Sequence, residues 1–166
     1  GLDTSIGPVT PANSVYALEG SAWASPPALA TARWGVHAFF VGATDEAVLV
    51  GTPAAATGAV RYARDGTQTN LGAIVRVLPA VTDLPDGRIV IAGGGLDTLD
   101  PATELPPTEI IDPASGSVTT LGLSPLGRWQ FVATAALGCP DASSVGYFFG
   151  GIATDAAGTR PRSEIY

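Results

Sequence analysis

Short apolar runs alternate with clusters of turn-forming residues along the whole chain. The runs include "EAVLV" (46–50), "GRIVIA" (87–92) and "VGYFF" (145–149), and Gly, Pro, Asp and Ser flank them. β-Branched and aromatic residues bounded in this way are typical of strands. No amphipathic run with the i, i+3, i+4, i+7 spacing extends to about 12 residues, so long helices are not expected. The pattern predicts an all-β protein.

The strand pattern recurs at a regular spacing. Each apolar run stops at small residues, and a short strand follows that ends at an aromatic or branched residue. A tight turn comes next, as in "RDGT" (64–67) and "DPASG" (112–116), and then another strand. Glycine is suited to the end of such an apolar strand because it adopts positive φ and lets neighbouring backbone or an aromatic ring approach closely. The residues expected to have such structural roles are Gly51, Gly93, Gly94, Gly150, Gly151, Tyr16, Trp23, Tyr62 and Tyr166.

Four strands in a unit of about 50 residues are typical of a propeller blade. The expected repeats cover approximately 15–58, 59–107 and 108–162, and residues 1–14 and 163–166 belong to flanking blades. The predicted fold is therefore a partial β-propeller of about three four-stranded antiparallel blades.

Two segments carry a family resemblance. "AVTDLPDGRIVIAGG" (80–94) and "TEIIDPASGSVTTLG" (108–122) resemble kelch repeats of the galactose-oxidase-like propeller group. The first unit departs from the kelch pattern at Gly51-Thr52, where a double glycine is usual, and Val60 stands where Glu109 opens the equivalent strand. A copper radical oxidase of this group would need two His, two Tyr and a Cys, and the chain has one His and one Cys. The resemblance thus implies the fold, with no metal and no cofactor.

Charge narrows the classes of partner. The net charge is −7, and all eight basic residues are Arg. This balance argues against nucleic acid and anionic membrane surfaces as partners, because a protein that binds them needs clustered positive charge. No apolar run approaches the roughly 18 residues of a membrane span, so no membrane insertion is expected. Together with Thr/Pro-rich loops and the frequent occurrence of the kelch group in secreted bacterial proteins, the charge favours an extracellular or periplasmic bacterial protein.

Candidate binding residues lie in the loops before each innermost strand, at the propeller rim. An Arg-Trp pair occurs twice at equivalent positions, and an Arg beside an indole can hold a carboxylate, a sugar face or a partner loop. The alternative is structural: the Arg bonds carbonyl groups of the next blade and the Trp fills a gap between blades. For His37 the kelch resemblance favours a structural role. The rim residues are Arg33, Trp34, His37, Arg76, Arg128, Trp129 and Gln130.

No complete catalytic set is recognisable, so no catalytic residue is assigned. The favoured function is a non-catalytic binding or scaffold module that presents rim loops to a protein or glycan. The alternative is part of a propeller enzyme acting on sugars, sialic-acid-processing or oxidase-like, whose catalytic residues lie outside this chain.

Three repeats are fewer than the four to eight blades of closed propellers. Three interpretations stay open: the remaining blades belong to a longer chain, two copies form a homodimer that closes a six-bladed propeller, or the sheets form a small open stack.

Overall fold

A computed structural model describes residues 12–41, 44–53, 58–76, 79–94, 106–123, 128–129, 132–136, 145–149, 152–155 and 158–161. These ranges form strands β1 to β15 and contain no helix, which confirms the all-β prediction. Accordingly, the described part of the chain has no helix that could cross a membrane.

Two complete antiparallel sheets form the centre of the molecule. In each sheet, four strands that are consecutive in the chain lie side by side. The first sheet consists of β3 (Arg33–Phe40), β4 (Glu46–Pro53), β5 (Ala59–Ala63) and β6 (Gln68–Asn70). The second sheet consists of β7 (Ala80–Asp83), β8 (Ile89–Ala92), β9 (Pro107–Asp112) and β10 (Ser117–Leu123).

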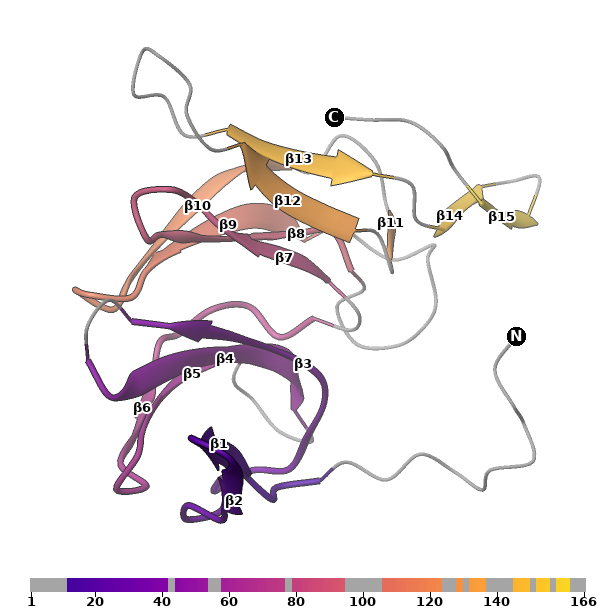
Figure 1. Cartoon of the computed structure of the whole chain (residues 1–166). Helices are drawn as coiled ribbons and strands as arrows, with labels where there is room; N and C mark the ends of the chain where they lie inside the picture. Colours follow the sequence, from indigo (N-terminus) through magenta and orange to yellow (C-terminus); the bar gives the residue numbers. More distant parts are fainter. Residues whose placement is uncertain are drawn as a thin grey trace, which may run out of the picture.

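Smaller sheets flank these two. The hairpin of β1 (Ala17–Glu19) and β2 (Ala22–Ala24) lies at one end of the stack, beyond the first sheet (Figure 1). The pair of β12 (Val132–Ala136) and β13 (Val145–Phe149) lies at the other end, where β12 contacts β7. A third small sheet joins β11 (Arg128–Trp129), β14 (Ile152–Asp155) and β15 (Gly158–Pro161). This stack is that of an all-β partial propeller.

The sequence period is offset from the sheets by two strands. The expected repeat 59–107 contains β5 and β6, which end the first sheet, and β7 and β8, which begin the second. Each such repeat therefore connects two neighbouring sheets.

The core lies between the two complete sheets. Val48 and Val50 on β4 face Ile89 and Ile91 on β8, and all four are at most 2% exposed. All four residues of β8 are buried, as expected for a strand covered on both faces. The full cluster comprises Val41, Val48, Val50, Ala59, Leu71, Ala73, Val81, Ile89, Ile91 and Ile111.

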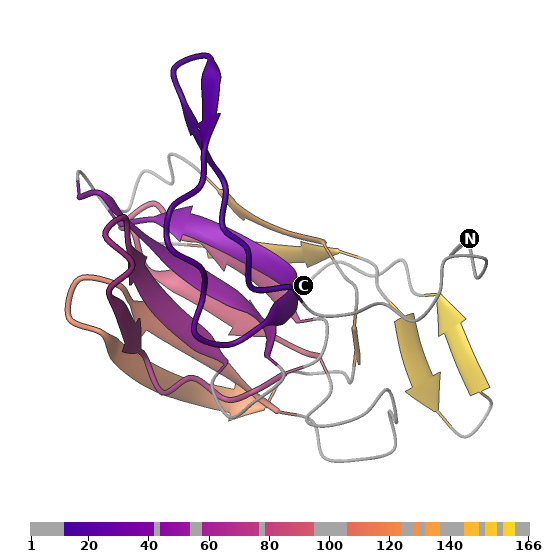
Figure 2. The same cartoon turned by 90° about the horizontal axis from the view of Figure 1, so that it is seen from below.

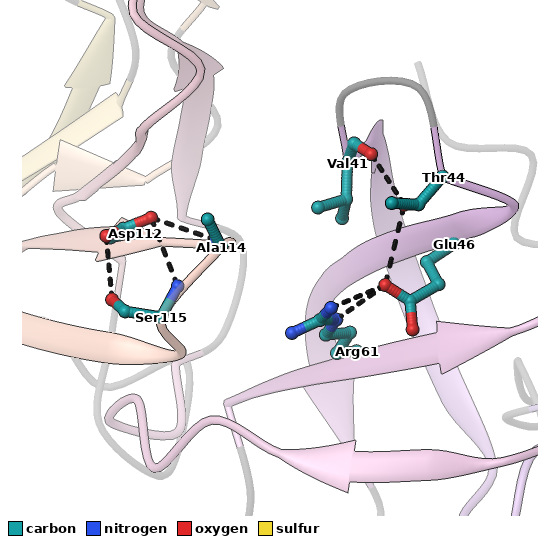
Figure 3. A network of polar contacts seen from close by, with 7 residues as sticks. All are labelled: Val41, Thr44, Glu46, Arg61, Asp112, Ala114 and Ser115. Atoms are coloured by element: carbon teal, nitrogen blue, oxygen red, sulfur yellow. Dashed lines mark hydrogen bonds and ion pairs between the residues drawn. The ribbon is translucent and has the colours of Figure 1, made fainter.

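Polar contacts border this apolar interface (Figure 3). Arg61 Nε and Nη2 donate to Glu46 Oε2 at 2.9 and 2.6 Å on the first sheet. Thr44 Oγ1 donates to the carbonyl of Val41 at 2.6 Å. On the second sheet, the carboxylate of Asp112 closes the turn between β9 and β10.

The predicted structural glycines differ in conformation. Gly93 and Gly94 have φ values of 61° and 80°, so the chain leaves β8 in the left-handed region that favours glycine. Gly51 lies within β4 and is not among the described glycines with positive φ. The close approach occurs at Gly58, where a Cβ would lie 2.1 Å from the Ile74 carbonyl oxygen. Gly150 and Gly151 lie outside the described residues, as does Tyr166.

The three described aromatic positions also differ. Tyr62 is 6% exposed, and its hydroxyl donates to the carbonyl of Pro27 at 2.6 Å. Tyr16 and Trp23 on the β1–β2 hairpin are 67% and 72% exposed. Of these three aromatic residues, only Tyr62 is therefore buried.

Candidate functional site

Arg33 and Arg76 make the same contact in successive sheets. Arg33 Nη1 donates to the carbonyl of Gly51 at 3.4 Å, and Arg76 Nη1 donates to that of Gly93 at 3.2 Å. Both side chains belong to buried residues. Arg33, the first residue of β3, thus contacts the part of β4 near its end, and Arg76, in the segment before β7, contacts the residue that follows β8.

Arg76 is further held by a buried carboxylate. Its Nη2 lies 2.8 Å from Glu109 Oε2 and also donates to the carbonyl of Pro107. Glu109 accepts a hydrogen bond from the backbone N–H of Ile74 at 3.1 Å. Burial lowers the pKa of the Arg76 guanidinium, and the Glu109 hydrogen bond and charge oppose that shift. In the first sheet, Val60 occupies the position equivalent to Glu109, and its side chain has no carboxylate.

These contacts favour the structural interpretation of the two arginines. The glycine carbonyls that accept these hydrogen bonds lie in or directly beside the sheet that each arginine adjoins, whereas the structural alternative expected acceptors in the next blade. Burial also lowers the pKa of Arg33. A role for either residue in ligand binding stays a prediction.

The other rim candidates begin β3 or belong to β11. Trp34 pairs with Thr52 through the backbone, and a register shift separates it from His37, whose partner is Val50. His37 is exposed, yet partial desolvation by the sheet lowers the pKa of its imidazole. Arg128 and Trp129 form β11, which pairs with β14. Gln130 and the side chains of Trp34, Arg128 and Trp129 lie outside the described residues, so their binding roles stay predictions.

A groove of about 350 Å³ lies between the β1–β2 hairpin and the outer face of the first sheet. Figure 2 shows the hairpin projecting from this sheet. Strand register places a row of apolar side chains on the groove floor, because Phe40 pairs with Ala47 and Ala47 pairs with Tyr62. Ala38 and Leu49 form the adjacent cross-strand pair. The floor is the face opposite to that of Val48 and Val50.

Phe40 dominates the open part of this floor. It is 87% exposed, more than any other large hydrophobic residue that the structure describes. Tyr62, at the covered part of the floor, is buried. The hairpin and the segment that follows it, which includes Pro27, therefore cover the β5 side of the sheet and leave the β3 side open.

The charged groups of the groove wall pair with one another. Arg64 forms an ion pair with Glu19 of the hairpin, and its Nη1 lies 3.5 Å from Asp45 Oδ2. These contacts tie β1 to the ends of the β4 and β5 strands. A charged ligand would have to compete with pairs already formed, whereas an apolar ligand would not.

Sequence reasoning missed this groove. Tyr16 and Phe40 are far apart in the chain, and only the sheet register brings β1 beside β3 to β5. The available signal was the alternation of Ala38, Phe40, Ala47 and Leu49, which gives the first sheet a second apolar face.

Within the described ranges, no group of three or more His, Cys, Asp or Glu side chains could hold a metal ion.

The likeness of this chain to known proteins is to solved structures. No family model matches the chain, and no curated protein does. Among solved structures, the chain is similar to a novel fungal alcohol oxidase with catalytic diversity among the AA5 family, in complex with copper. The identity is 23% and the TM-score is 0.40, over 66% of this chain and 21% of that chain. The chain thus spans about a fifth of that oxidase, and a TM-score this low transfers no function.

Proposed function

We propose that this chain is a non-catalytic binding module that holds an extended, apolar segment of polypeptide in the groove beside β1. The observation that carries the proposal is that Phe40, on an apolar sheet face, is 87% exposed. Exposed apolar surface of this kind marks interaction sites in soluble proteins. The volume, about 350 Å³, lies within the range of ligand sites.

A polypeptide strand fits this groove better than a sugar or an ion. Glu19 and Asp45 share Arg64 as their ion-pair partner, and Glu46, which also lines the groove, pairs with Arg61. This pairing leaves the apolar floor as the main attraction. Among the described strands, β1 pairs with β2 alone, so its other edge offers backbone donors and acceptors. An added strand gains affinity from such backbone groups and specificity from alternate side chains.

We also propose that the sheets belong to a kelch-type propeller. The support is the arginine-to-glycine-carbonyl contact, which recurs beside the first two strands of each complete sheet, at Arg33–Gly51 and Arg76–Gly93. The "IVIA" strand that runs into Gly93 and Gly94 adds to this support.

The binding proposal is tested with the labelled chain on two arrays, one of decapeptides with alternating apolar positions and one of glycans. We expect capture by the peptides. Phe40→Ser should reduce that signal at least about tenfold, because a central aromatic anchor is lost. Ala114→Ser, in the exposed turn between β9 and β10, is the matched control and should leave capture unchanged.

Two results would contradict the proposal. Capture by glycans alone would identify a carbohydrate-binding module. Peptide capture that survives Phe40→Ser at full strength would place the binding surface outside the groove.

A further inference from the structure

We infer that the polypeptide segment in the groove carries a Lys or Arg residue, placed two positions from the apolar residue that covers Phe40. This cation binds beside Asp45, at the end of the groove where the charged side chains gather. The inference rests on the proposed function, because it names the chemistry of the segment that the same groove holds. Three observations support it: the order of side chains along the groove, the ion pairs at its charged end, and the net charge of the chain.

Side chains on the groove floor form rows that cross the strands. One row consists of Phe40, Ala47 and Tyr62, which are register partners on β3, β4 and β5. Ala38 and Leu49 form the next row in one direction. Because successive residues of a strand point to opposite faces, neighbouring rows are two residues, or about 7 Å, apart. The floor therefore presents its side chains at a fixed interval along the strands.

A charged row continues this series on the other side of Phe40. Asp45 lies two residues before Ala47, next to the start of β4. Arg64 lies two residues after Tyr62, and both charged residues line the groove. The backbone N–H of Arg64 donates to the carbonyl of Asp45 at 3.2 Å, which places the two residues side by side. One end of the groove is therefore charged, whereas the floor beyond it is apolar.

The charged end has an excess of negative charge. Arg64 Nη2 donates to a carboxylate oxygen of Glu19, and Arg64 Nη1 lies 3.5 Å from Asp45 Oδ2. Glu46 also lines the groove, but its carboxylate is already held by two hydrogen bonds from Arg61. Two carboxylates thus share the charge of Arg64. Among the charged groups of the groove that the structure describes, one negative charge is left without a balancing cation.

Asp45 is the carboxylate that a ligand can reach. Its side chain is 77% exposed, compared with 41% for that of Glu19. A carboxylate accepts hydrogen bonds at both of its oxygens, so Asp45 can bind a ligand cation while Arg64 stays near Oδ2. Such a cation competes only with the longer of the two Arg64 contacts. An anionic group would instead have to displace one of the two carboxylates from Arg64.

The position of the cation in the ligand follows from the packing of strands. Strands of sheets that pack face to face stay within about 30° of one another. The two complete sheets follow this rule, since their strands run in similar directions (Figure 1). An extended segment that lies along the groove floor in the same way presents alternate side chains every 7 Å or so. The ligand residue on Phe40 and the ligand residue at Asp45 are then two positions apart.

The charge of the whole chain favours the same partner. The net charge of the chain is −7. An acidic protein attracts a basic segment at long range and repels an acidic one. A second copy of this chain carries the same net charge, which makes it a less suitable occupant of the groove than a basic segment.

Fluorescence anisotropy with labelled decapeptides tests the inference on the full chain. Each peptide is acetylated and amidated, and it has a central Leu with apolar residues at alternate positions. Lys replaces the residue two positions before the Leu in one peptide and two positions after it in another. One of these two peptides should bind at least about threefold more tightly than its Gln counterpart, because it gains an exposed ion pair. Lys one position from the Leu points to the other face of the peptide and should give no gain.

Variants of the protein test the place of the cation. The Lys and Gln peptides should bind Asp45→Asn with equal affinity, and Asp45→Lys should prefer the Glu counterpart to the Lys peptide. Asp86→Asn is the matched control, because it removes an exposed carboxylate that pairs with Arg88 outside the groove lining, and it should keep the Lys preference. In 1 M NaCl the Lys preference should shrink, since salt screens exposed charges.

The outcomes separate this inference from the proposed function. Equal affinities for the Lys, Gln and Glu peptides that are lost in Phe40→Ser overturn the cation and still support the binding module. A preference for Glu overturns the inference and identifies Arg64 as the charged contact. A Lys preference that survives in full in Asp45→Asn overturns the assignment to Asp45. Self-association through Phe40 that excludes every peptide identifies a second copy as the occupant, and binding of no peptide without self-association contradicts the proposed function itself.

Discussion

Arg76 and Glu109 place a charge pair in the interior, with side chains only 1% and 2% exposed. Glu109→Ala should lower the free energy of unfolding by about 3–5 kcal/mol, because it leaves the buried guanidinium without its carboxylate partner. The measurement is urea unfolding followed by tryptophan fluorescence and circular dichroism.

Asp45→Ala provides the comparison for that prediction. It removes a pair with Arg64 whose side chains are 54% and 77% exposed, and solvent screens such pairs. We expect a change of about 1 kcal/mol or less. Equal losses of unfolding free energy in both variants would show that the buried Arg76–Glu109 pair stabilises the fold no more than an exposed pair does.

Gly58 is a position where adding a Cβ atom should change the stability of the fold. Gly58→Ala would place Cβ 2.1 Å from the backbone oxygen of Ile74, so the segment after β6 must move away from β5. We expect a loss of about 1–3 kcal/mol in the free energy of unfolding. Gly122→Ala is the control, since nothing lies within 4 Å of its added Cβ, and it should be neutral or slightly stabilising. An unaffected Gly58→Ala protein would contradict the close approach.

The sequence predicted the recurring arginines but not their partners. Arg33 and Arg76 stand at equivalent positions in the pattern, and either ligand binding or carbonyl binding was compatible with it. The acceptors, Gly51 and Gly93, follow from the pairing of the first two strands in each sheet, which the pattern of single residues does not contain.

At the scale of elements, aspartates order the tight turns between outer strands. Asp65 Oδ1 accepts from the backbone N–H of Thr67 at 2.8 Å, and Asp112 Oδ1 accepts from that of Ala114 at 2.9 Å. The Thr67 hydrogen bond lowers the pKa of Asp65 below its ordinary 3.8, and the Ser115 hydroxyl, which donates to Asp112, lowers that of Asp112.

The sign of the resulting pH dependence follows from these directions. A carboxyl group whose pKa is lower in the folded state stabilises the fold above its unfolded pKa of 3.8, and this contribution is lost as the pH falls through the folded value. The double variant Asp65→Asn with Asp112→Asn should therefore lose less stability between about pH 6 and pH 3 than the wild type does. Urea midpoints at the two pH values measure the difference. Identical acid losses in both proteins would show that other groups govern the acid response.

Hairpins were the elements most readily predicted. The segments "RDGT" and "DPASG" signalled turns, and Gly66 and Gly116 adopt the positive φ that such turns require. The sheet of β11, β14 and β15 was not anticipated, because its strands are short and are paired across the intervening β12–β13 pair. The repeat period likewise could not show where one sheet ends and the next begins.

At the scale of the whole molecule, the stack of sheets followed from the repeat, whereas the groove did not. A strand that is apolar on both faces, such as β8, indicates a sheet between two neighbours. The same alternation on β3 and β4 could not reveal that the hairpin covers only part of the first sheet's outer face. That partial cover depends on how segments distant in the chain are arranged. Predicting the groove requires this arrangement, which the sequence pattern does not contain.

The consecutive order of strands in each complete sheet bears on how the protein forms as it leaves the ribosome. All four strands of the first sheet are synthesised before β7, so this sheet can pair internally while the second is still being made. The face with Phe40 is complete as soon as β3, β4 and β5 have paired, before any strand of the second sheet is made. During synthesis the nascent chain therefore exposes an apolar surface of the kind that promotes aggregation and that chaperones bind.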